Sequence, residues 1–249
     1  MIKSKLKLSN PNSKLKKYQG LYIFSLPAGY SCPTAKLCKS QADRDTGRVS
    51  DGKDTVFRCF AASTEAYSGN YRKMVWHNFD ELKKVQKSQE KMAALLEDSI
   101  PTTAKYLRMH GGGDFFNEAY LRAWMDVAGT RPNCLFYGYT KQTGLFLKYQ
   151  DKFPQNFRLT VSEGGTQDYM LDGLQVPTVS VVNHPDDAEE QKIAIDHDDS
   201  HAMEGNHSFA VLLHGTQPAG STSAAALKRM RTEKIKFGYG KKKAKNGKS

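Results

Sequence analysis

The sequence lacks any apolar run of 18 or more residues, and its basic N-terminus is not followed by an apolar core. The first absence excludes a membrane-spanning helix, and the second argues against a secretory signal peptide. The 249 residues are 39% hydrophobic and 10% aromatic, the composition of a folded protein with a sizeable core. We therefore expect a cytoplasmic protein without a membrane partner, whose cysteines stay reduced.

Acidic residues are few at the two ends of the chain, where positive charge is concentrated. The net charge is +11, yet residues 1–17 contribute +6 and residues 228–249 contribute +9, which leaves the body at −4. Basic ends attract nucleic acid weakly and non-specifically, and they are equally often only solvated. We expect a basic N-terminal arm over 1–17, a single α/β domain over 18–227 and a basic, disordered tail over 228–249.

Cysteine is scarce, and three of the four cysteines lie in the first quarter of the chain. Cys32 and Cys38 share one loop after an expected strand, and Cys59 follows in a short apolar segment. Thiolates are soft ligands that suit zinc, Cu(I) or iron–sulfur clusters. The spacing, C-x5-C-x20-C, differs from the C-x2-C of a zinc ribbon and from a ferredoxin run. Buried, inert cysteines are the alternative, but the polar loop favours a soft-metal site.

Cys134 stands apart from the other three cysteines. It opens an expected strand over 134–141, so it lies about 16 Å from the end of that strand where a site would form. A thiolate must approach its metal to about 2.3 Å. We therefore expect Cys134 to be a buried structural residue, which leaves the fourth metal position open or filled by His110 or Asp114.

Strand and helix patterns alternate along the chain. A long amphipathic helix is expected from Asn78 to about Leu96, with Asn78 or Asp80 as its cap. Further helices are expected over 117–127 and near 144–148, and the expected strands are 21–26, 106–110, 134–141, 157–165, 176–182 and 209–214. This alternation predicts a parallel sheet in an α/β fold, arranged as a partial or distorted (β/α) barrel. An open doubly wound sheet is the alternative.

Polar residues follow several of the expected strands. A His-Gly-Gly-Gly-Asp motif follows one strand, Lys141 the next and Glu163 another. Since the carboxyl ends of parallel strands meet at one functional edge, we expect these residues to line a cofactor pocket beside the cysteines. Gly112 and Gly113 would let the backbone approach the cofactor, and Asp114 would hold an amine or a metal. Alone, the motif is equally typical of a glycine-rich turn into a helix.

A second group of potential ligands lies closer to the C-terminus. Residues 196–201 read Asp-His-Asp-Asp-Ser-His, and His207 follows. His197 and His201 are four residues apart, which would suit a metal site on a helix. No helical pattern is evident in this segment, so a solvated acidic loop is the favoured interpretation.

Several motifs occur in an order that resembles a bacteriophage family called gene product eighty-eight. They are Asn12-Ser-Lys-Leu, Phe24-Ser-Leu-Pro-Ala-Gly-Tyr-Ser-Cys-Pro, Cys59-Phe-Ala, Arg108-Met-His-Gly-Gly-Gly-Asp-Phe-Phe and Phe136-Tyr-Gly-Tyr-Thr-Lys, and together they span residues 10–165. The family looks like a relative of radical S-adenosylmethionine (SAM) barrels. The resemblance implies a viral protein in the cytoplasm of the infected host bacterium.

The same resemblance implies roles for individual residues. Cys32, Cys38 and Cys59 match the cysteine loop that would bind a [4Fe-4S] cluster, and Asp114 matches the acidic motif that holds the amino group of SAM. The sequence departs from radical SAM enzymes because these usually carry C-x3-C-x2-C in one tight loop. It also has no cysteine between Val181 and His214, where many family members carry a second cluster.

The sequence is compatible with three functions. The first is an iron–sulfur protein with redox or radical-SAM-like chemistry on an unidentified substrate, its pocket lined by Asp114, Lys141 and Glu163. The second is a non-enzymatic electron-transfer or sensing protein that meets a redox partner. The third is a zinc-stabilised protein whose basic ends bind nucleic acid, which the acidic body argues against.

Overall fold

The computed structural model of the chain describes residues 5–237. Its centre is a seven-stranded sheet, and a separate two-stranded hairpin lies beside it. The sheet strands are β1 (Leu21–Ile23), β4 (Tyr106–Met109), β5 (Leu135–Thr140), β6 (Phe157–Ser162), β7 (Thr178–Val182), β8 (Ala194–Ile195) and β9 (Phe209–Leu212), and the hairpin strands are β2 (Ser40–Ala42) and β3 (Val49–Asp51). The helices are α1 (Phe60–Tyr67), α2 (Gly69–Lys84), α3 (Gln89–Glu97), α4 (Glu118–Thr130), α5 (Thr143–Tyr149), α6 (Pro185–Glu190), α7 (Ser200–Glu204) and α8 (Thr222–Thr232), with short 3-10 turns at Gln150–Lys152 and Asp168–Leu171.

The predicted α/β class is confirmed, because every pair of neighbours in the large sheet is parallel. The strand order is β1-β4-β5-β6-β7-β9-β8, so strands are added in one direction along the chain until β8 takes the far edge. This order lacks the reversal of a doubly wound sheet. Within the described residues β1 and β8 are edge strands, so the sheet is open and does not close into a barrel.

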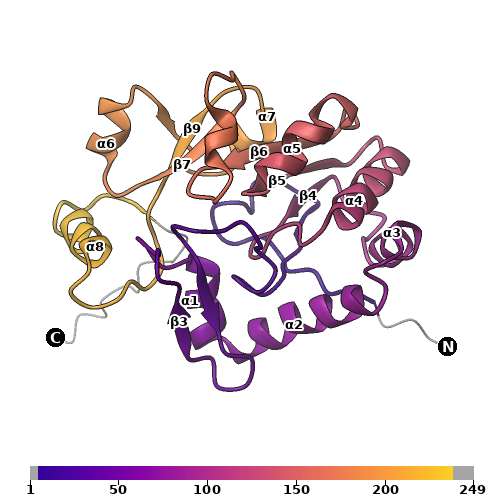
Figure 1. Cartoon of the computed structure of the whole chain (residues 1–249), viewed down its shortest axis with the longest axis horizontal. Coiled ribbons are helices and arrows are strands. Elements are labelled where there is room, and N and C mark those ends of the chain that lie inside the picture. The colour runs from indigo at the N-terminus through magenta and orange to yellow at the C-terminus, as the bar shows by residue number, and fades with distance from the viewer. Residues whose placement is uncertain (1–4, 238–249) are drawn as a thin grey trace, which may run out of the picture.

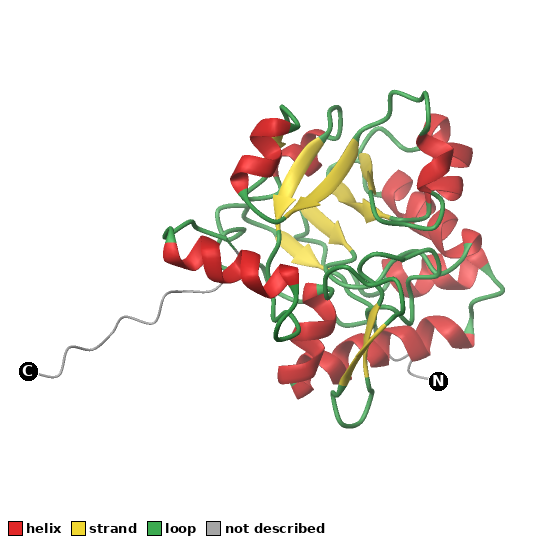
Figure 2. Cartoon of the chain, turned by 60° about the vertical axis from the view of Figure 1, so that its left-hand side comes forward, coloured by secondary structure: helices red, strands yellow, loops and turns green. Residues whose placement is uncertain are grey.

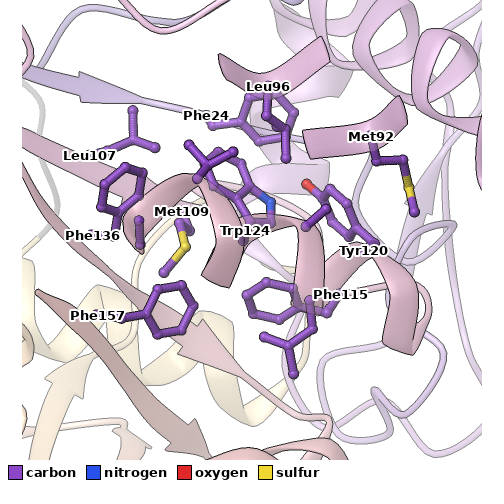
Figure 3. Packing of buried hydrophobic residues seen from close by; sticks show 14 of the residues in the cluster. Phe24, Met92, Leu96, Leu107, Met109, Phe115, Tyr120, Trp124, Phe136 and Phe157 are labelled. Atoms are coloured by element: carbon purple, nitrogen blue, oxygen red, sulfur yellow. The ribbon is translucent and has the colours of Figure 1, made fainter. Parts of the chain in front are cut away.

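One face of the sheet packs against α3 and α4 (Figure 1). Side chains alternate along a strand, so Leu107 and Met109 of β4 point to this face together with Phe136 of β5. Trp124 of α4 lies among them and is fully buried (Figure 3). Its ring meets that of Phe24 edge to face at 5.3 Å. This cluster holds the sheet in place relative to the helices that follow its strands.

The opposite face of the sheet is covered by the N-terminal segment and by α7. Leu15 is fully buried there, beside Tyr137, Val179 and Phe209 of the sheet and Ala202 of α7. The described part of the basic arm is therefore packed onto the fold. The arm is held further by paired backbone hydrogen bonds between Ser9 and Ile23, at 2.8 and 3.0 Å.

The predicted helix over 78–96 is wrong, because this segment holds two helices. The first, α2, ends at Lys84, and the second, α3, starts after Ser88, whose hydroxyl accepts the N–H of Lys91. Asn78 does not cap a helix; it is buried inside α2, and its side-chain amide bonds to Lys7 and Ser25. The apolar spacing continues across the break, so periodicity alone missed it.

The C-terminal boundary also differs from the prediction. Residues 228–232, assigned to the disordered tail, form the end of α8, and Met230 is fully buried. The rest of the expected tail from residue 238 onward lies outside the described residues. Figure 2 shows the strands at the centre, helices around them, and the β2–β3 hairpin among the loops on one side. No helix in the described part of the chain is long and apolar enough to cross a membrane.

Candidate functional site

A cavity of about 170 Å³ lies at the carboxyl edge of the sheet. Its walls combine the cysteine loop with the ends of β4, β5 and β6, as predicted for a parallel sheet. The residues from the sequence prediction that line it are Cys32, Cys38, Cys59, His110, Gly112, Gly113, Asp114 and Lys141. Cys134 is elsewhere, 3% exposed in the core beneath the helices.

The cysteine loop is fastened to the ends of two strands. The Thr34 hydroxyl donates to the carbonyl oxygen of Lys141 at 2.6 Å, just after β5. The backbone N–H of Leu37 donates to the carbonyl oxygen of Gly164 at 2.9 Å, just after β6. These contacts place Cys32 and Cys38 over the strand ends, where the cavity opens.

The β2–β3 hairpin returns the chain to the first two cysteines. Its strands begin just after Cys38, and beyond them the N–H groups of Val56 and Phe57 donate to the carbonyl oxygen of Leu37 at 2.8 and 3.2 Å. Cys59 follows as the N-cap residue of α1. The hairpin thus explains how Cys59, 21 residues beyond Cys38, joins the same cavity.

All three cavity thiols are held in their protonated form by burial. Burial raises the pKa of Cys32 well above its usual range, and the nearby charges of Asp114 and the other two cysteines raise it further. Burial likewise raises the pKa of Cys38, against the lowering effect of Lys141. Cys59 has a pKa of about 12, again from burial, although the N–H groups at the start of α1 favour its thiolate. Thiolates in one cavity would repel each other unless a cation joined them.

The glycines of the motif after β4 are required by close packing. Gly113 has φ +86°, and a Cβ there would lie 2.5 Å from Ser31 Oγ and 2.6 Å from Leu26 Cβ. A Cβ at Gly112 would lie 2.8 Å from Ala61 Cβ. The turn can therefore lie against both the cysteine loop and α1 only because it has no side chains at these positions.

His110 lines the cavity and has one buried ring nitrogen without a hydrogen-bond partner among the described residues. It adopts φ +60°, an uncommon backbone conformation for a residue other than glycine. Its Nε2 lies 3.1 Å from the Tyr120 hydroxyl, whereas its buried Nδ1 has no hydrogen-bond partner among the described residues. Burial lowers the pKa of His110 to about 3, so the ring is neutral at physiological pH. A neutral imidazole nitrogen of this kind is suited to ligate a metal.

Asp114 is buried and accepts three hydrogen bonds. Its Oδ1 accepts the N–H of Phe115 and the hydroxyl of Thr140, both at 2.7 Å, and its Oδ2 accepts the N–H of Lys141 at 2.8 Å. Burial raises its pKa to about 6 despite these donors. Each carboxylate oxygen can accept two hydrogen bonds, so Oδ2 keeps capacity for one more donor.

Lys141 and Glu163 occupy different places in the site. The Lys141 ammonium lines the cavity and donates to Ser162 Oγ at 2.9 Å and to the carbonyl oxygens of Ser162 and Glu163. The Glu163 carboxylate instead accepts the hydroxyl of Ser180 at 2.6 Å and is not part of the cavity wall. Of the two predicted residues, only Lys141 presents its side chain to the cavity.

Arg108 and His214 also line the cavity. His214 follows an expected strand at the predicted functional edge, whereas the sequence did not identify Arg108 as a site residue. Arg108 is buried and pairs through Nη1 with Asp199 Oδ2 at 3.2 Å, and the Tyr137 hydroxyl donates to the same oxygen at 2.9 Å. The alternation along β4 was the available signal, because it places Arg108 on the opposite face from Leu107 and Met109.

The segment over 196–201 is not a solvated loop, contrary to the expectation from the sequence. Asp196 and Asp199 are buried, and a short helix, α7, begins at Ser200. Asp196 accepts the N–H groups of Asp198 and Ala202, which explains its burial. His197 is exposed and does not converge with His201 on a common site.

Comparison with known proteins supports the family resemblance. The family model for Gene product 88 matches residues 2–234 and so extends well beyond the motifs that suggested it. Comparison with curated proteins and with solved structures found no match. From its motifs and the extent of this match, the chain belongs to the Gene product 88 family.

Proposed function

We propose that this protein binds a [4Fe-4S] cluster through Cys32, Cys38 and Cys59 and uses it for redox or radical-SAM-like chemistry. The observation that carries the proposal is that three separated cysteines line one cavity at the carboxyl edge of a parallel sheet. Iron–sulfur clusters are held by cysteine thiolates, so the donor set fits. From β1 to β7 the strands are added in one direction along the sheet, which supports a partial barrel of the radical SAM kind.

The spacing of the sulfurs favours a cluster over one zinc ion. A single tetrahedral zinc ion with bonds of about 2.3 Å needs sulfurs about 3.8 Å apart. Within residues 5–237, the three sulfurs are not among the ligand sets whose atoms all lie within 4.8 Å of one another. In a cluster each thiolate would bind a different iron, so the three cysteine sulfurs could lie farther apart than around one zinc ion.

The chain's own residues prepare the thiols for metal. Because burial raises the pKa of all three, each must lose its proton when a metal binds. The Lys141 ammonium favours the thiolate of Cys38, and the start of α1 favours that of Cys59. When bound, the cluster would supply single electrons to a substrate or to SAM.

SAM is the cofactor proposed for the position beside Cys32. Asp114 Oδ2 has room for one more donor, and an amino group is such a donor. Gly112 and Gly113 line the same wall and bring Asp114 close to the cysteine loop. These residues would bind and orient the amino-acid end of SAM. The site of action would be the cytoplasm of the infected host bacterium.

The second candidate is an electron-transfer or sensing protein without SAM. The specific observation in its favour is the buried, unpartnered Nδ1 of His110, a neutral nitrogen that would serve as the fourth ligand. Asp114 is a weaker alternative because three donors already occupy it. Under this candidate, His110→Asn changes the spectrum of the reduced cluster, and SAM has no effect.

Iron content of two cysteine variants tests the cluster assignment. After anaerobic reconstitution with iron and sulfide, a Cys32→Ser/Cys38→Ser/Cys59→Ser chain should hold almost no iron. Cys134→Ser is the matched control and should hold as much as the unmodified protein. Equal iron in both variants would refute the assignment. Zinc without iron, together with salt-sensitive DNA binding, would support the nucleic-acid alternative.

A further inference from the structure

We infer that His201, Glu204 and His207 form a second metal site, which binds a divalent transition-metal ion of the Zn²⁺ class. Within the described residues these three side chains are the set of potential ligands whose atoms all lie within 4.8 Å of one another. Two imidazoles and one carboxylate form a nitrogen–oxygen donor set that suits zinc or ferrous iron. The absence of thiolate makes it chemically different from the cysteine cavity.

The local fold explains how these residues converge. His201 and Glu204 are three residues apart on α7, so they lie on the same face of the helix. Gly205 then ends the helix in the left-handed conformation, at φ +66°, and packs on Arg158, where a Cβ would lie 2.8 Å from Arg158 Cδ. This turn directs His207 back toward the helix before β9 begins.

The geometry of the two imidazoles resembles that of metal ligands. His201 Nδ1 and His207 Nε2 face each other at 2.5 Å, so one of these two nitrogens donates to the other. His207 Nδ1 lies 2.6 Å from Asn206 Oδ1, and donation to this oxygen leaves Nε2 as the nitrogen with the lone pair. Metal-binding histidines are usually oriented by such a hydrogen bond from the other ring nitrogen.

The third ligand and the support of the site are also present. Glu204 Oε2 lies 3.7 Å from His207 Nδ1, and the side chains of Glu204 and His207 are 58% and 39% exposed to solvent. The His201 ring stacks on Phe209 with centroids 5.6 Å apart, which limits its rotation. An ion can therefore enter from solvent once the proton on His201 Nδ1 moves through solvent to Nε2 of the same ring, which leaves both facing nitrogens able to bind the ion and further coordination positions for water.

The site lies at the opposite end of the strands from the cysteine cavity. His207 immediately precedes the amino end of β9, whereas the cysteines face the carboxyl ends of the strands. α7 packs against β5 and β6, and its Ala202 is buried on the face of the sheet that the N-terminal segment also covers. A metal here would join α7 to the segment that enters β9 and stabilise that face.

Zinc binding to the full chain tests this inference. We expect His207→Gln to bind one zinc ion fewer per chain than the unmodified protein, whereas His197→Ala, an exposed histidine in the preceding loop, should bind the same amount. Asn206→Ala should bind the ion roughly 10- to 100-fold more weakly, because it removes the orienting hydrogen bond.

X-ray absorption at the zinc edge separates this ion from zinc on the cysteines. The ion lost in His207→Gln should have only nitrogen and oxygen neighbours at about 2.0–2.1 Å, without sulfur at about 2.3 Å. Equal zinc content in the unmodified protein and His207→Gln would overturn the inference. If the zinc ion lost in His207→Gln had sulfur neighbours, that result would overturn the inference as well.

Discussion

Thr34 and Lys141 join the cysteine loop to the central sheet through one buried hydrogen bond of 2.6 Å. The donor is the hydroxyl of Thr34, two residues beyond Cys32, and the acceptor is the carbonyl oxygen of the residue that follows β5. The Lys141 N–H in turn donates to Asp114. The backbone of one residue, Lys141, thus connects the cysteine loop with the acidic residue of the cavity.

Removing the Thr34 hydroxyl should loosen this connection. Thr34→Val keeps the shape of the side chain but leaves a buried carbonyl oxygen without this donor, which typically costs about 1–3 kcal/mol. We expect that loss in the free energy of unfolding, measured with urea. Thr46→Val, an exposed hydroxyl in the hairpin loop, is the control and should cost less than about 1 kcal/mol. Equal losses would show that the contact has no special role.

Gly113 should not tolerate a side chain, whereas Gly173, whose φ is similarly positive, should tolerate one. Gly113→Ala adds a Cβ 2.5 Å from Ser31 Oγ in addition to the strain of φ +86°. Gly173→Ala has φ +76° but no neighbour within 4 Å, so it experiences the backbone strain alone, roughly 1–2 kcal/mol. We expect thermal unfolding to show a clearly larger loss for Gly113→Ala, accompanied by a lower iron content. Similar losses would argue against close packing at the cavity wall.

Much of this fold could be predicted from the sequence because its strands alternate with helices and end in polar motifs. The edge that gathers Cys32, Cys38 and Asp114 follows from parallel strands alone. The break between α2 and α3 was not predictable in this way, since Val85 continues the apolar spacing. The ion pair of Arg108 with Asp199 was also missed, because it depends on where α7 folds back onto the sheet.

The spacing of histidines in the sequence did not identify the two histidines that meet in the structure. His197 and His201 suggested a pair four residues apart, but His197 is exposed. The residue that does meet His201 is His207, which returns only because Gly205 ends α7 in a left-handed turn. A short helix closed by a turn does not produce a periodic pattern long enough to recognise in the sequence.

Glu65 should make the metal-free protein less stable as the pH rises. Its Oε1 accepts the N–H of Ala28 at 2.8 Å, but its buried Oε2 has no partner among the described residues. Burial raises its pKa from 4.5 to about 7. Because the folded-state pKa is the higher one, stability is greatest below about pH 4.5 and falls as the pH rises toward 7, by up to roughly 3 kcal/mol.

Urea unfolding at pH 5 and pH 8 measures this effect. Glu65→Gln keeps an acceptor for Ala28 but cannot ionise, so its stability should fall less than that of the unmodified protein over this interval. Glu189→Gln, at an exposed position of α6, should leave the pH dependence unchanged. If Glu65→Gln follows the unmodified protein at both pH values, burial of this carboxylate is not the cause.

Asp114 should decide whether SAM binds. Asp114→Asn keeps one oxygen for Phe115 and Thr140, but it replaces Oδ2, which accepts the Lys141 N–H and would accept an amine, with an NH2 group that can only donate. We expect SAM affinity, measured by calorimetry on the cluster-loaded protein, to fall by at least about tenfold, since a charge-assisted hydrogen bond contributes about 1.5–3 kcal/mol. Cluster content should stay unchanged. Unaltered SAM affinity would remove Asp114 from the binding site.

The most direct test of the central claim is the iron and sulfide content of protein purified without oxygen, with electron paramagnetic resonance after reduction. A [4Fe-4S] cluster on Cys32, Cys38 and Cys59 predicts about four irons and four sulfides per chain and a signal from the reduced cluster. A colourless protein that contains zinc and neither iron nor sulfide, and that gives no such signal, would contradict it.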